Sequence, residues 1–339
     1  MTAPLLAVED LKVHFARAGR GWGRPPEVVK AVDGVSFAVA RGRTLAVVGE
    51  SGSGKTTTAL AVMRLAPITA GRITLGDTDL GRLEGEALRQ ARRRLQFIFQ
   101  DPFSSLNPRQ RAGDAVRAPL DLMKVGTSAE RTDRVAELFA QVGLRPEQQH
   151  LFPHQFSGGQ RQRINIARAL ATQPELVVCD EPVSALDVAI RAQILNLLAR
   201  LQRELGLTYL FISHDMAVVE HICDDIVVLY LGQIVERAPR REFFARPLHP
   251  YSVALMSAVP TVHGGRARAA ARIQLSGDPP SPINPPAGCR FAGRCPFSEP
   301  ACATEPPPLR EVAPGHAVRC RRIDVVDGTP RPILQAQAV

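Results

Sequence analysis

Two apolar patterns alternate along the chain up to about residue 237. Short runs in which nearly every residue is apolar predict buried strands at 44–48, 97–99, 176–179, 209–212 and 226–229. Helical patterns occupy 129–142, 160–171 and 190–205, and in the last of these the apolar residues recur every three or four positions. Strands that alternate with helices predict an α/β fold, in which a mostly parallel sheet is covered on both faces.

The pattern changes after residue 237. Of the 28 prolines, 17 lie from Pro239 onward, together with four of the six cysteines. Because proline removes a backbone donor and interrupts helices, we expect a loop-rich segment that something other than a regular core must hold together. The sequence therefore predicts a domain over residues 1–240 and a small, Cys- and Pro-rich extension over 241–339. A stretch rich in Gly and Pro, 17–26, predicts a flexible loop near the N-terminus.

Composition excludes some classes of protein. The longest unbroken apolar runs have six or seven residues, whereas a membrane span needs about 20, so we expect no transmembrane helix. The N-terminus carries acidic residues where a secretory signal needs basic ones, so we expect the chain to stay in the cytoplasm. The net charge of +9 suits phosphates, nucleic acid or an anionic membrane face without choosing among them. Cysteines in a cytoplasmic chain are expected to be free, metal-bound or redox-active.

Residues 49–56 fit the phosphate-loop pattern G-x-x-x-x-G-K-[ST] at every fixed position. The loop follows a predicted strand and precedes a helix-compatible run, which is the context that the motif requires. We expect Lys55 to contact the β- and γ-phosphates of a nucleotide and Thr56 to offer its hydroxyl to Mg²⁺. The predicted nucleotide-binding residues are Gly49, Glu50, Ser51, Gly52, Ser53, Gly54, Lys55, Thr56 and Thr57.

Three further strand ends carry polar side chains that suit the same site. Asp180 and Glu181 follow strand 176–179, so we expect Asp180 to bind Mg²⁺ and Glu181 to polarise the attacking water. His214 follows strand 209–212 and is predicted to contact the γ-phosphate. Gln100 follows strand 97–99, where its amide suits Mg²⁺ or the water. Alone, each residue would more often be structural, but together with the phosphate loop they predict a catalytic site.

Residues 156–160, FSGGQ, resemble the LSGGQ signature of ATP-binding cassette proteins. Phe156 replaces the usual leucine and leaves the phosphate-contacting residues intact. Ser157 is predicted to cap a helix that begins near Gln160, with Gly158 and Gly159 permitting close backbone approach, which makes a second anion site at a helix N-terminus. The order of all these motifs along the chain also matches the family.

The resemblance implies a P-loop NTPase fold with a RecA-like core, an antiparallel β subdomain and a helical signature subdomain. It implies an ATPase whose dimer holds two ATP molecules, each between one chain's phosphate loop and the other chain's signature residues, Ser157, Gly158, Gly159 and Gln160. It also implies that Glu181, His214 and Gln100 act in hydrolysis, with Mg²⁺ held by Thr56, Gln100 and Asp180, and that 184–187 communicates across the dimer. An aromatic residue usually stacks on adenine, and both Phe15 and Trp22 are candidates here.

Further segments look like the ATPase subunits of dipeptide and oligopeptide importers, at 49–51, 99–102, 105–108, 181–187 and 249–251. Residues 30–36 and the loop at 16–26 look more like the second, F-type, of two such subunits. The resemblance implies a heterodimer with the first subunit, docked under two membrane permeases on the cytoplasmic face of the inner membrane. A separate binding protein would deliver the cargo, the segment after Gln100 would contact a permease, and no nucleic acid would take part.

Cys289, Cys295, Cys302 and Cys320 are spaced C-x5-C-x6-C-x17-C, unlike the C-x2-C pattern of zinc ribbons. They resemble the terminal extension of peptide-importer ATPases, in which a [4Fe–4S] cluster can be bound. Zn²⁺, with His316 as a substitute ligand, and free thiols remain alternatives. Five neighbouring arginines are expected to offset thiolate charge: Arg290, Arg294, Arg319, Arg321 and Arg322. Cys179 and Cys223 lie in apolar contexts and are expected to be core thiols.

Two other functions stay open at this stage. One is a soluble cassette ATPase that acts on nucleic acid or ribosomes, which the basic charge permits. Proteins of that kind carry either two cassettes in one chain or a long coiled coil between the phosphate loop and the signature. This chain has one phosphate loop, and only 102 positions separate Thr56 from Gly158, so neither arrangement fits. The other is an importer of nickel chelates or another non-peptide cargo, because this subunit does not touch the cargo.

Overall fold

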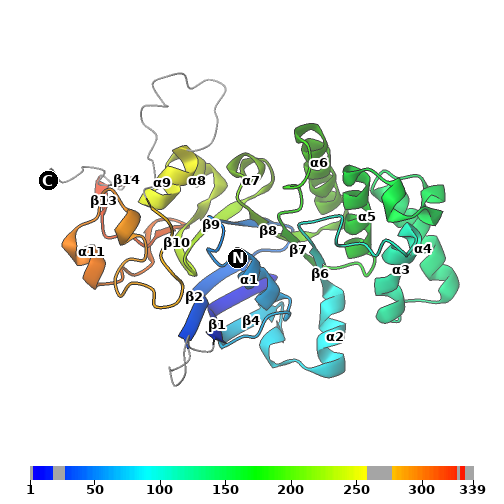
Figure 1. Ribbon diagram of the computed structural model, residues 1–339, viewed down its shortest axis with the longest axis horizontal. Coiled ribbons are helices and arrows are strands. Elements are labelled where there is room, and N and C mark those ends of the chain that lie inside the picture. Colours follow the sequence, from blue (N-terminus) through cyan, green and yellow to red (C-terminus); the bar gives the residue numbers. More distant parts are fainter. Residues whose placement is uncertain (1–2, 18–26, 258–276, 327–328, 333–339) are drawn as a thin grey trace.

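The computed structural model describes residues 3–17, 27–257, 277–326 and 329–332. Its centre is an eight-stranded sheet in the order β11-β12-β10-β9-β3-β8-β7-β6 (Figure 1). The strands from β9 to β6 run parallel, and β10, β11 and β12 add antiparallel pairs at one edge. In the described residues, no helix is both long and apolar enough to cross a membrane.

The predicted strands all form, within a few residues of the expected bounds. The sheet's strands are β3 (Thr44–Val48), β6 (Leu95–Ile98), β7 (Leu176–Asp180), β8 (Thr208–Ser213), β9 (Asp225–Tyr230), β10 (Gln233–Pro239), β11 (Arg310–Ala313) and β12 (His316–Val318). The helices around them are α1 (Lys55–Val62), α2 (Gly85–Arg94), α3 (Ala112–Leu122), α4 (Ser128–Gln141), α5 (Gly158–Leu170), α6 (Val188–Leu205), α7 (Met216–Ile222), α8 (Arg240–Ala245) and α9 (Pro250–Ser257).

The central strands are apolar at most positions because both of their faces are buried. In β7, Leu176 and Val178 point into a core shared with α1 and the N-terminal strands, whereas Val177 and Cys179 point into a core shared with α5 and α6. Cys179 is fully buried, as expected of a core thiol. The alternation fixes the register of the strand, and with it the direction in which the residues after its end project.

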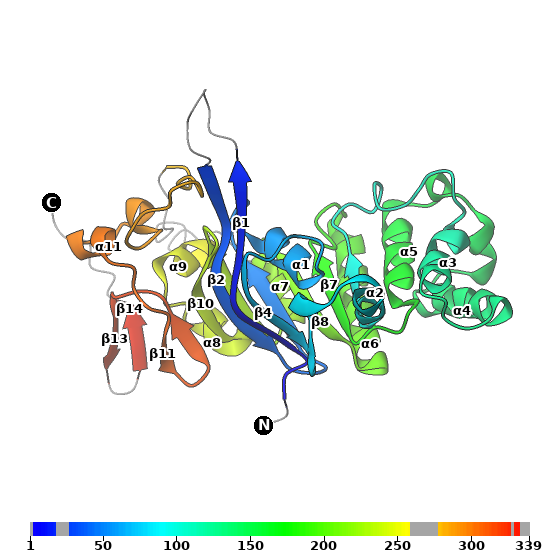
Figure 2. The same ribbon diagram turned by 90° about the horizontal axis from the view of Figure 1, so that it is seen from below.

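A second sheet, in the order β2-β1-β4-β5, covers one face of the central sheet (Figure 2). It consists of β1 (Leu6–Arg17), β2 (Glu27–Val39), β4 (Ala70–Leu75) and β5 (Thr78–Asp79), and its pairs are antiparallel. The short helix η1 (Leu80–Arg82) follows it. This sheet is the antiparallel subdomain that the family resemblance implies. Most of the loop predicted at 17–26 lies outside the described residues.

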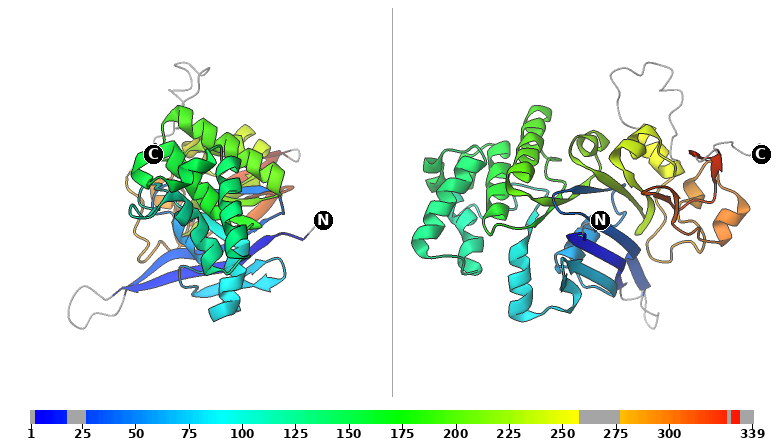
Figure 3. Two further views of the ribbon diagram at one scale, coloured as in Figure 1. Left: turned by 90° about the vertical axis from the view of Figure 1, so that its right-hand side faces the viewer. Right: turned by 180° about the vertical axis from the view of Figure 1, so that it is seen from behind.

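Helices α3, α4 and α5 form a lobe at one end of the molecule (Figure 3). Two short helices, η2 (Pro146–His150) and η3 (Pro153–Gln155), connect α4 to α5. Apolar side chains such as Val116, Phe139 and Ile164 are fully buried between these helices. The lobe corresponds to the expected helical subdomain and places the start of α5 at its exposed edge.

The C-terminal extension lies at the opposite end, beside β10 (Figure 1). It contains η4 (Ala292–Arg294), α11 (Pro300–Thr304), β13 (Ile323–Val326) and β14 (Thr329–Pro332), besides β11 and β12. Because β12 pairs with β10, the extension continues the central sheet. Glu236 of β10 is fully buried and accepts hydrogen bonds from the Leu248 and His249 N–H groups and from His316, each at 2.8 Å. These bonds fasten the extension to the sheet.

Candidate functional site

The phosphate loop connects the end of β3 to the start of α1. Gly54, at φ 104°, is the N-cap residue of α1, and a Cβ there would lie 2.4 Å from the Ala31 carbonyl oxygen of β2. A Cβ on Gly49 would lie 2.2 Å from the Leu229 carbonyl oxygen of β9. Only glycine therefore fits at either position. The N–H groups in the first turn of α1 point toward the loop, where they suit an anion.

Lys55 is buried within the phosphate loop. Its Nζ donates hydrogen bonds to the carbonyl oxygens of Gly49 and Glu50, both at 2.8 Å. Burial lowers the pKa of Lys55, and the nearby carboxylates of Glu181 and Asp180 oppose that shift. These two hydrogen bonds hold the Lys55 ammonium group against the loop, where it can contact a phosphate.

Thr56 and Asp180 meet as expected of residues around one magnesium ion. The Thr56 hydroxyl donates to Oδ1 of Asp180 at 3.3 Å, although the two residues are 124 positions apart in the sequence. Burial raises the pKa of Asp180, and the hydrogen bond from Thr56 opposes that shift. A hydroxyl and a carboxylate side by side are oxygen ligands of the kind that Mg²⁺ prefers.

Glu181 lies between two other predicted residues. Its Oε2 accepts a hydrogen bond from Nε2 of Gln100 at 3.0 Å, and its Oε1 lies 2.9 Å from Nδ1 of His214. Its backbone has φ 47°, an unfavourable conformation for a residue other than glycine, and its N–H donates to the Ile212 carbonyl at 3.0 Å. Such strain persists where the surrounding structure fixes it, often at functional sites.

These residues surround a cavity of about 570 Å³. Of the predicted residues, its wall contains Ser51, Gly52, Gly54, Lys55, Thr56, Thr57, Gln100, Glu181 and His214. Val29, Ala31 and Pro282 also line it, and no local pattern in the sequence indicated these three. Phe15 pairs with Val29 across β1 and β2 but is not among the residues that line the cavity, and Trp22 lies outside the described residues. Pro282 belongs to the C-terminal extension, which therefore contributes to the cavity.

The signature residues lie on the helical lobe, apart from the described wall of this cavity. Helix α5 begins at Gly158, two residues earlier than expected, and Ser157 caps it. The Ser157 hydroxyl accepts from the Gln160 N–H at 3.3 Å, and the Gln160 side chain accepts from the Ser157 N–H at 3.0 Å. A Cβ on Gly159 would lie 2.5 Å from Cγ2 of Ile190, so α5 and α6 approach closely there.

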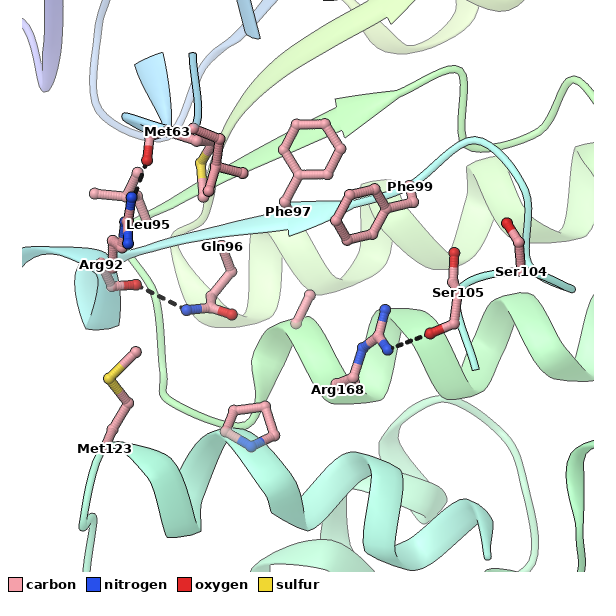
Figure 4. A pocket seen from close by; sticks show the side chains of 13 residues that line it. Met63, Arg92, Leu95, Gln96, Phe97, Phe99, Ser104, Ser105, Met123 and Arg168 are labelled. Atoms are coloured by element: carbon pink, nitrogen blue, oxygen red, sulfur yellow. Dashed lines mark hydrogen bonds between the residues drawn. The ribbon is translucent and has the colours of Figure 1, made fainter. Parts of the chain in front are cut away.

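A groove of about 470 Å³ separates the end of α1 and β6 from the helical lobe (Figure 4). Phe99 and Leu65 line it, and their side chains are 42% and 53% exposed. Arg168 of α5 also lines it and donates a hydrogen bond to the Ser105 carbonyl at 2.6 Å. The groove therefore borders the segment that follows Gln100.

The four cysteines of the extension line a second, much smaller cavity of about 20 Å³. Burial raises the pKa of Cys295 to about 11 and that of Cys320 to about 12. In the ranges that the structure describes, no group of three or more His, Cys, Asp or Glu side chains is arranged to hold a metal ion. His316, the expected substitute ligand, instead bonds to Glu236.

Two arginines beside these cysteines form ion pairs that the sequence did not indicate. Arg290 bonds to the carboxylate of Asp33 and to the Leu231 carbonyl. Arg294 bonds to the carboxylate of Glu50 in the phosphate loop. Both guanidinium groups reach into the nucleotide-binding domain. Of the other arginines expected to offset thiolate charge, Arg319 and Arg322 act on Cys289 and Cys295, where their charges oppose the rise in pKa caused by burial.

Two family models match the chain. A model described as "ABC transporter" matches residues 32–184, and one described as "Oligopeptide/dipeptide transporter, C-terminal region" matches 235–302. Among solved structures, a dimeric ATP-binding cassette bound to ADP and phosphate, MJ0796, has a TM-score of 0.61 and 28% identity and covers 70% of this chain and 99% of its own. The cbiO1 protein of Clostridium perfringens has a TM-score of 0.62 and 25% identity, with 72% and 92% covered.

Curated relatives match nearly the whole chain. A peptide import ATP-binding protein of Brucella ovis is 50% identical and covers 95% of this chain and 99% of its own. The oligopeptide transport ATP-binding protein AppF of Bacillus subtilis is 47% identical, covering 93% and 96%. The corresponding OppF protein of Salmonella typhimurium is 48% identical, covering 94% and 96%. The chain therefore belongs to the ATP-binding cassette family, as an ATPase of the group that contains these transport ATP-binding proteins.

Proposed function

We propose that this chain is the subunit that couples ATP hydrolysis to peptide import, working as a dimer beneath membrane permeases. One observation carries the proposal: a complete phosphate-loop site and a C-terminal region of the oligopeptide and dipeptide transporter type occur in one chain, and the second contributes Pro282 to the cavity of the first. The names of the relatives favour peptides over nickel or other cargo. They also favour import over action on nucleic acid or ribosomes.

Within this proposal, each residue at the cavity has a task. The phosphate loop binds the β- and γ-phosphates, and Lys55 balances their charge. Thr56, Asp180 and Gln100 would hold Mg²⁺, whose charge would stabilise the negative charge that develops on the transferred phosphoryl group. Glu181 accepts a proton from the attacking water, while Gln100 and His214 orient the Glu181 carboxylate. Ser157, Gly158, Gly159 and Gln160 complete the site of the partner chain's ATP.

The proposed arrangement divides the chain into the ATPase domain over 1–240 and the transporter-specific extension over 241–339. A permease binds the groove beside Phe99 and Leu65, whose exposed apolar side chains suit a protein partner. The chain then lies on the cytoplasmic face of the inner membrane. The second ATPase is a different chain, as in the importers that the F-type features resemble, and a binding protein delivers the peptide.

Purification of the tagged chain from its native membrane tests this function. We expect two permeases and a second ATPase to co-purify, and ATP hydrolysis in vesicles to rise when a peptide-loaded binding protein is added. Co-purification with ribosomes or DNA alone would contradict the proposal. Alanine at Phe99 should release the permeases, whereas alanine at the equally exposed Leu205, which lies at the end of α6, should not.

We also propose that Cys289, Cys295, Cys302 and Cys320 bind a [4Fe–4S] cluster, with Zn²⁺ as the alternative. Four thiols around one cavity are the donor set that such a cluster takes, and closing them around it needs a rearrangement from the described positions. Metal–thiolate bonds would tie together four segments of a proline-rich extension that has little regular core.

Anaerobic purification tests the metal. We expect a brown protein with equal amounts of iron and acid-labile sulfide, and loss of both in Cys295→Ser. The matched variant Cys179→Ser, in the core of β7, should keep both. A colourless protein that contains zinc, or one that contains no metal, would reject the cluster.

A further inference from the structure

An ion pair connects the cysteine-bearing turn of the extension to the phosphate loop. Arg294 is 9% exposed, and its Nη1 and Nη2 atoms lie 2.7 and 3.2 Å from the two carboxylate oxygens of Glu50. The two residues are 244 positions apart. Two parallel bonds between a planar guanidinium and a carboxylate fix orientation as well as distance. The buried position also weakens the competition from water.

Glu50 is in turn bonded to the residue that meets the phosphates. Its carbonyl oxygen accepts a hydrogen bond from Nζ of Lys55 at 2.8 Å. Its N–H donates to the hydroxyl of Tyr251 at 2.7 Å, and Tyr251 lies in α9, beyond the last strand of the ATPase domain. Arg294 therefore holds the side chain of Glu50, one of the two residues whose carbonyl oxygens orient the Lys55 ammonium group.

Arg290 supports the opposite side of the loop. It bonds to Asp33 of β2 and to the Leu231 carbonyl in the turn between β9 and β10. In that turn, the Gly232 N–H donates to the Ser53 carbonyl of the phosphate loop at 2.8 Å. Arg294 thus bonds directly to the loop at Glu50, and Arg290 bonds to the turn that contacts the loop at Ser53.

The turn that carries both arginines is itself firmly packed. Phe291 is 1% exposed, and its ring lies 5.2 Å from that of Tyr230 and 5.5 Å from that of Tyr251. The Cys289 N–H donates to the Cys302 carbonyl at 2.7 Å. In the described arrangement this packing holds the turn and the groups that it bonds in place, so the extension supports the loop.

We propose that Arg294 is a positioning residue for ATP binding, through which the cysteine-bearing turn at 289–295 holds the phosphate loop in its nucleotide-ready shape. Arg294 contacts Glu50 of the loop and is not among the described residues that line the cavity. Its loss therefore weakens ATP binding while the hydrolytic residues on β7 and β8 keep their geometry. The inference deepens the proposed function, since it concerns the same site.

A double-mutant cycle on the full chain tests the inference, using a fluorescent ATP analogue with Mg²⁺. We expect Arg294→Met to weaken binding roughly tenfold, the size of effect typical of a lost hydrogen-bonded charge pair. Glu50→Gln should weaken binding similarly, and the double variant should be no weaker than either single variant, because both remove the same contact. Arg294→Lys, which keeps the charge without the paired bonds, should lie between wild type and Arg294→Met.

Arg321→Met is the control, because it removes another Arg–Glu ion pair of the extension, the more exposed one to Glu305, away from the phosphate loop. We expect it to change binding by less than about twofold. In the assembled importer, Arg294→Met should raise KM for ATP and leave kcat within about twofold of wild type. Binding of the analogue needs no permease, so this measurement separates failure of the inference from failure of the proposed transport function.

Two results would overturn the inference. One is an Arg294→Met protein that binds the analogue as tightly as Arg321→Met does. The other is a double variant whose loss equals the sum of the single losses in free energy. If Arg294→Met does not fold, Glu50→Gln decides the matter, because its side chain is 29% exposed and the change keeps its shape. Wild-type affinity in Glu50→Gln would then reject the proposal.

Discussion

The carboxylate of Glu181 and the imidazole of His214 lie 2.9 Å apart, at the ends of neighbouring parallel strands. Gln100, at the end of β6 on the other side of β7, bonds the second oxygen of the same carboxylate. Three adjacent strands therefore converge on one side chain. Since the carboxyl ends of parallel strands share an edge of the sheet, sequence positions as distant as 100 and 214 meet there.

Replacing Glu181 by Gln should abolish turnover and leave nucleotide binding intact. The amide keeps the size of the side chain but cannot accept a proton from water, so we expect kcat to fall at least about 100-fold. Phosphate release measures turnover, and a fluorescent ATP analogue measures binding. Glu175→Gln is the matched control at the opposite end of β7, where Glu175 pairs with Arg41 and Arg94. If Glu181→Gln kept the same kcat as Glu175→Gln, another residue would be the base.

Ser157→Arg should stop hydrolysis by a dimer, because a large cation at the start of α5 blocks the surface offered to the partner's nucleotide. Thr127→Arg is a close control in the same lobe, since Thr127 caps α4 with the same reciprocal pattern, here with Glu130. Both changes lose an N-cap, at a cost of about 1 kcal/mol. We expect only Ser157→Arg to abolish phosphate release. Equal losses in both would reduce the role of Ser157 to capping.

The sequence predicted the site better than its surroundings. The strand before Gly49, the helix after Lys55 and the strand ends at Asp180 and His214 follow from short apolar runs next to polar residues, which are local patterns. The start of α5 shifted to Gly158 because the cap at Ser157 defines the helix boundary more sharply than apolar periodicity does.

Contacts between residues far apart in the sequence were not predicted, because no local pattern encodes them. Arg294 lies 244 positions from Glu50, and its neighbour Cys295 suggested a thiolate as the partner. Pro282 lines the nucleotide cavity because its carbonyl accepts a hydrogen bond from the Lys30 N–H at 3.0 Å, a pairing between segments with no shared motif. Only the folded extension brings these residues to the phosphate loop.

Asp180→Asn should abolish Mg²⁺-dependent hydrolysis and yet stabilise the protein. The pKa of Asp180 is raised by burial, so its ionised form is less favourable in the folded chain than in the unfolded one. As pH rises from the unfolded pKa through the raised folded pKa, the unfolded state releases its proton first, and stability falls. Asparagine carries no charge and keeps an oxygen for Thr56. At pH 7 without nucleotide, we expect a higher Tm than wild type; a lower Tm would contradict this argument.

His249 should make the extension sensitive to acid. Burial lowers the pKa of His249 to about 3, and its Nδ1 accepts a hydrogen bond from the Tyr251 N–H at 3.1 Å. Below the unfolded pKa near 6.5, only the unfolded chain takes up this proton, so stability is lost as pH falls from there. For this residue alone, the loss from pH 7.5 to 5.5 is about 1.4 kcal/mol.

The variant His249→Asn isolates this contribution from that of the other histidines. Its side-chain oxygen keeps an acceptor for the Tyr251 N–H but does not titrate. Urea unfolding at pH 7.5 and 5.5 measures the free energy of unfolding of each protein. We expect the wild type to lose about 1.4 kcal/mol more than the variant between these values. Equal losses would mean that His249 is protonated in the folded chain. Its burial beside Phe291 and the nearby positive charge of Arg319 both disfavour that protonation.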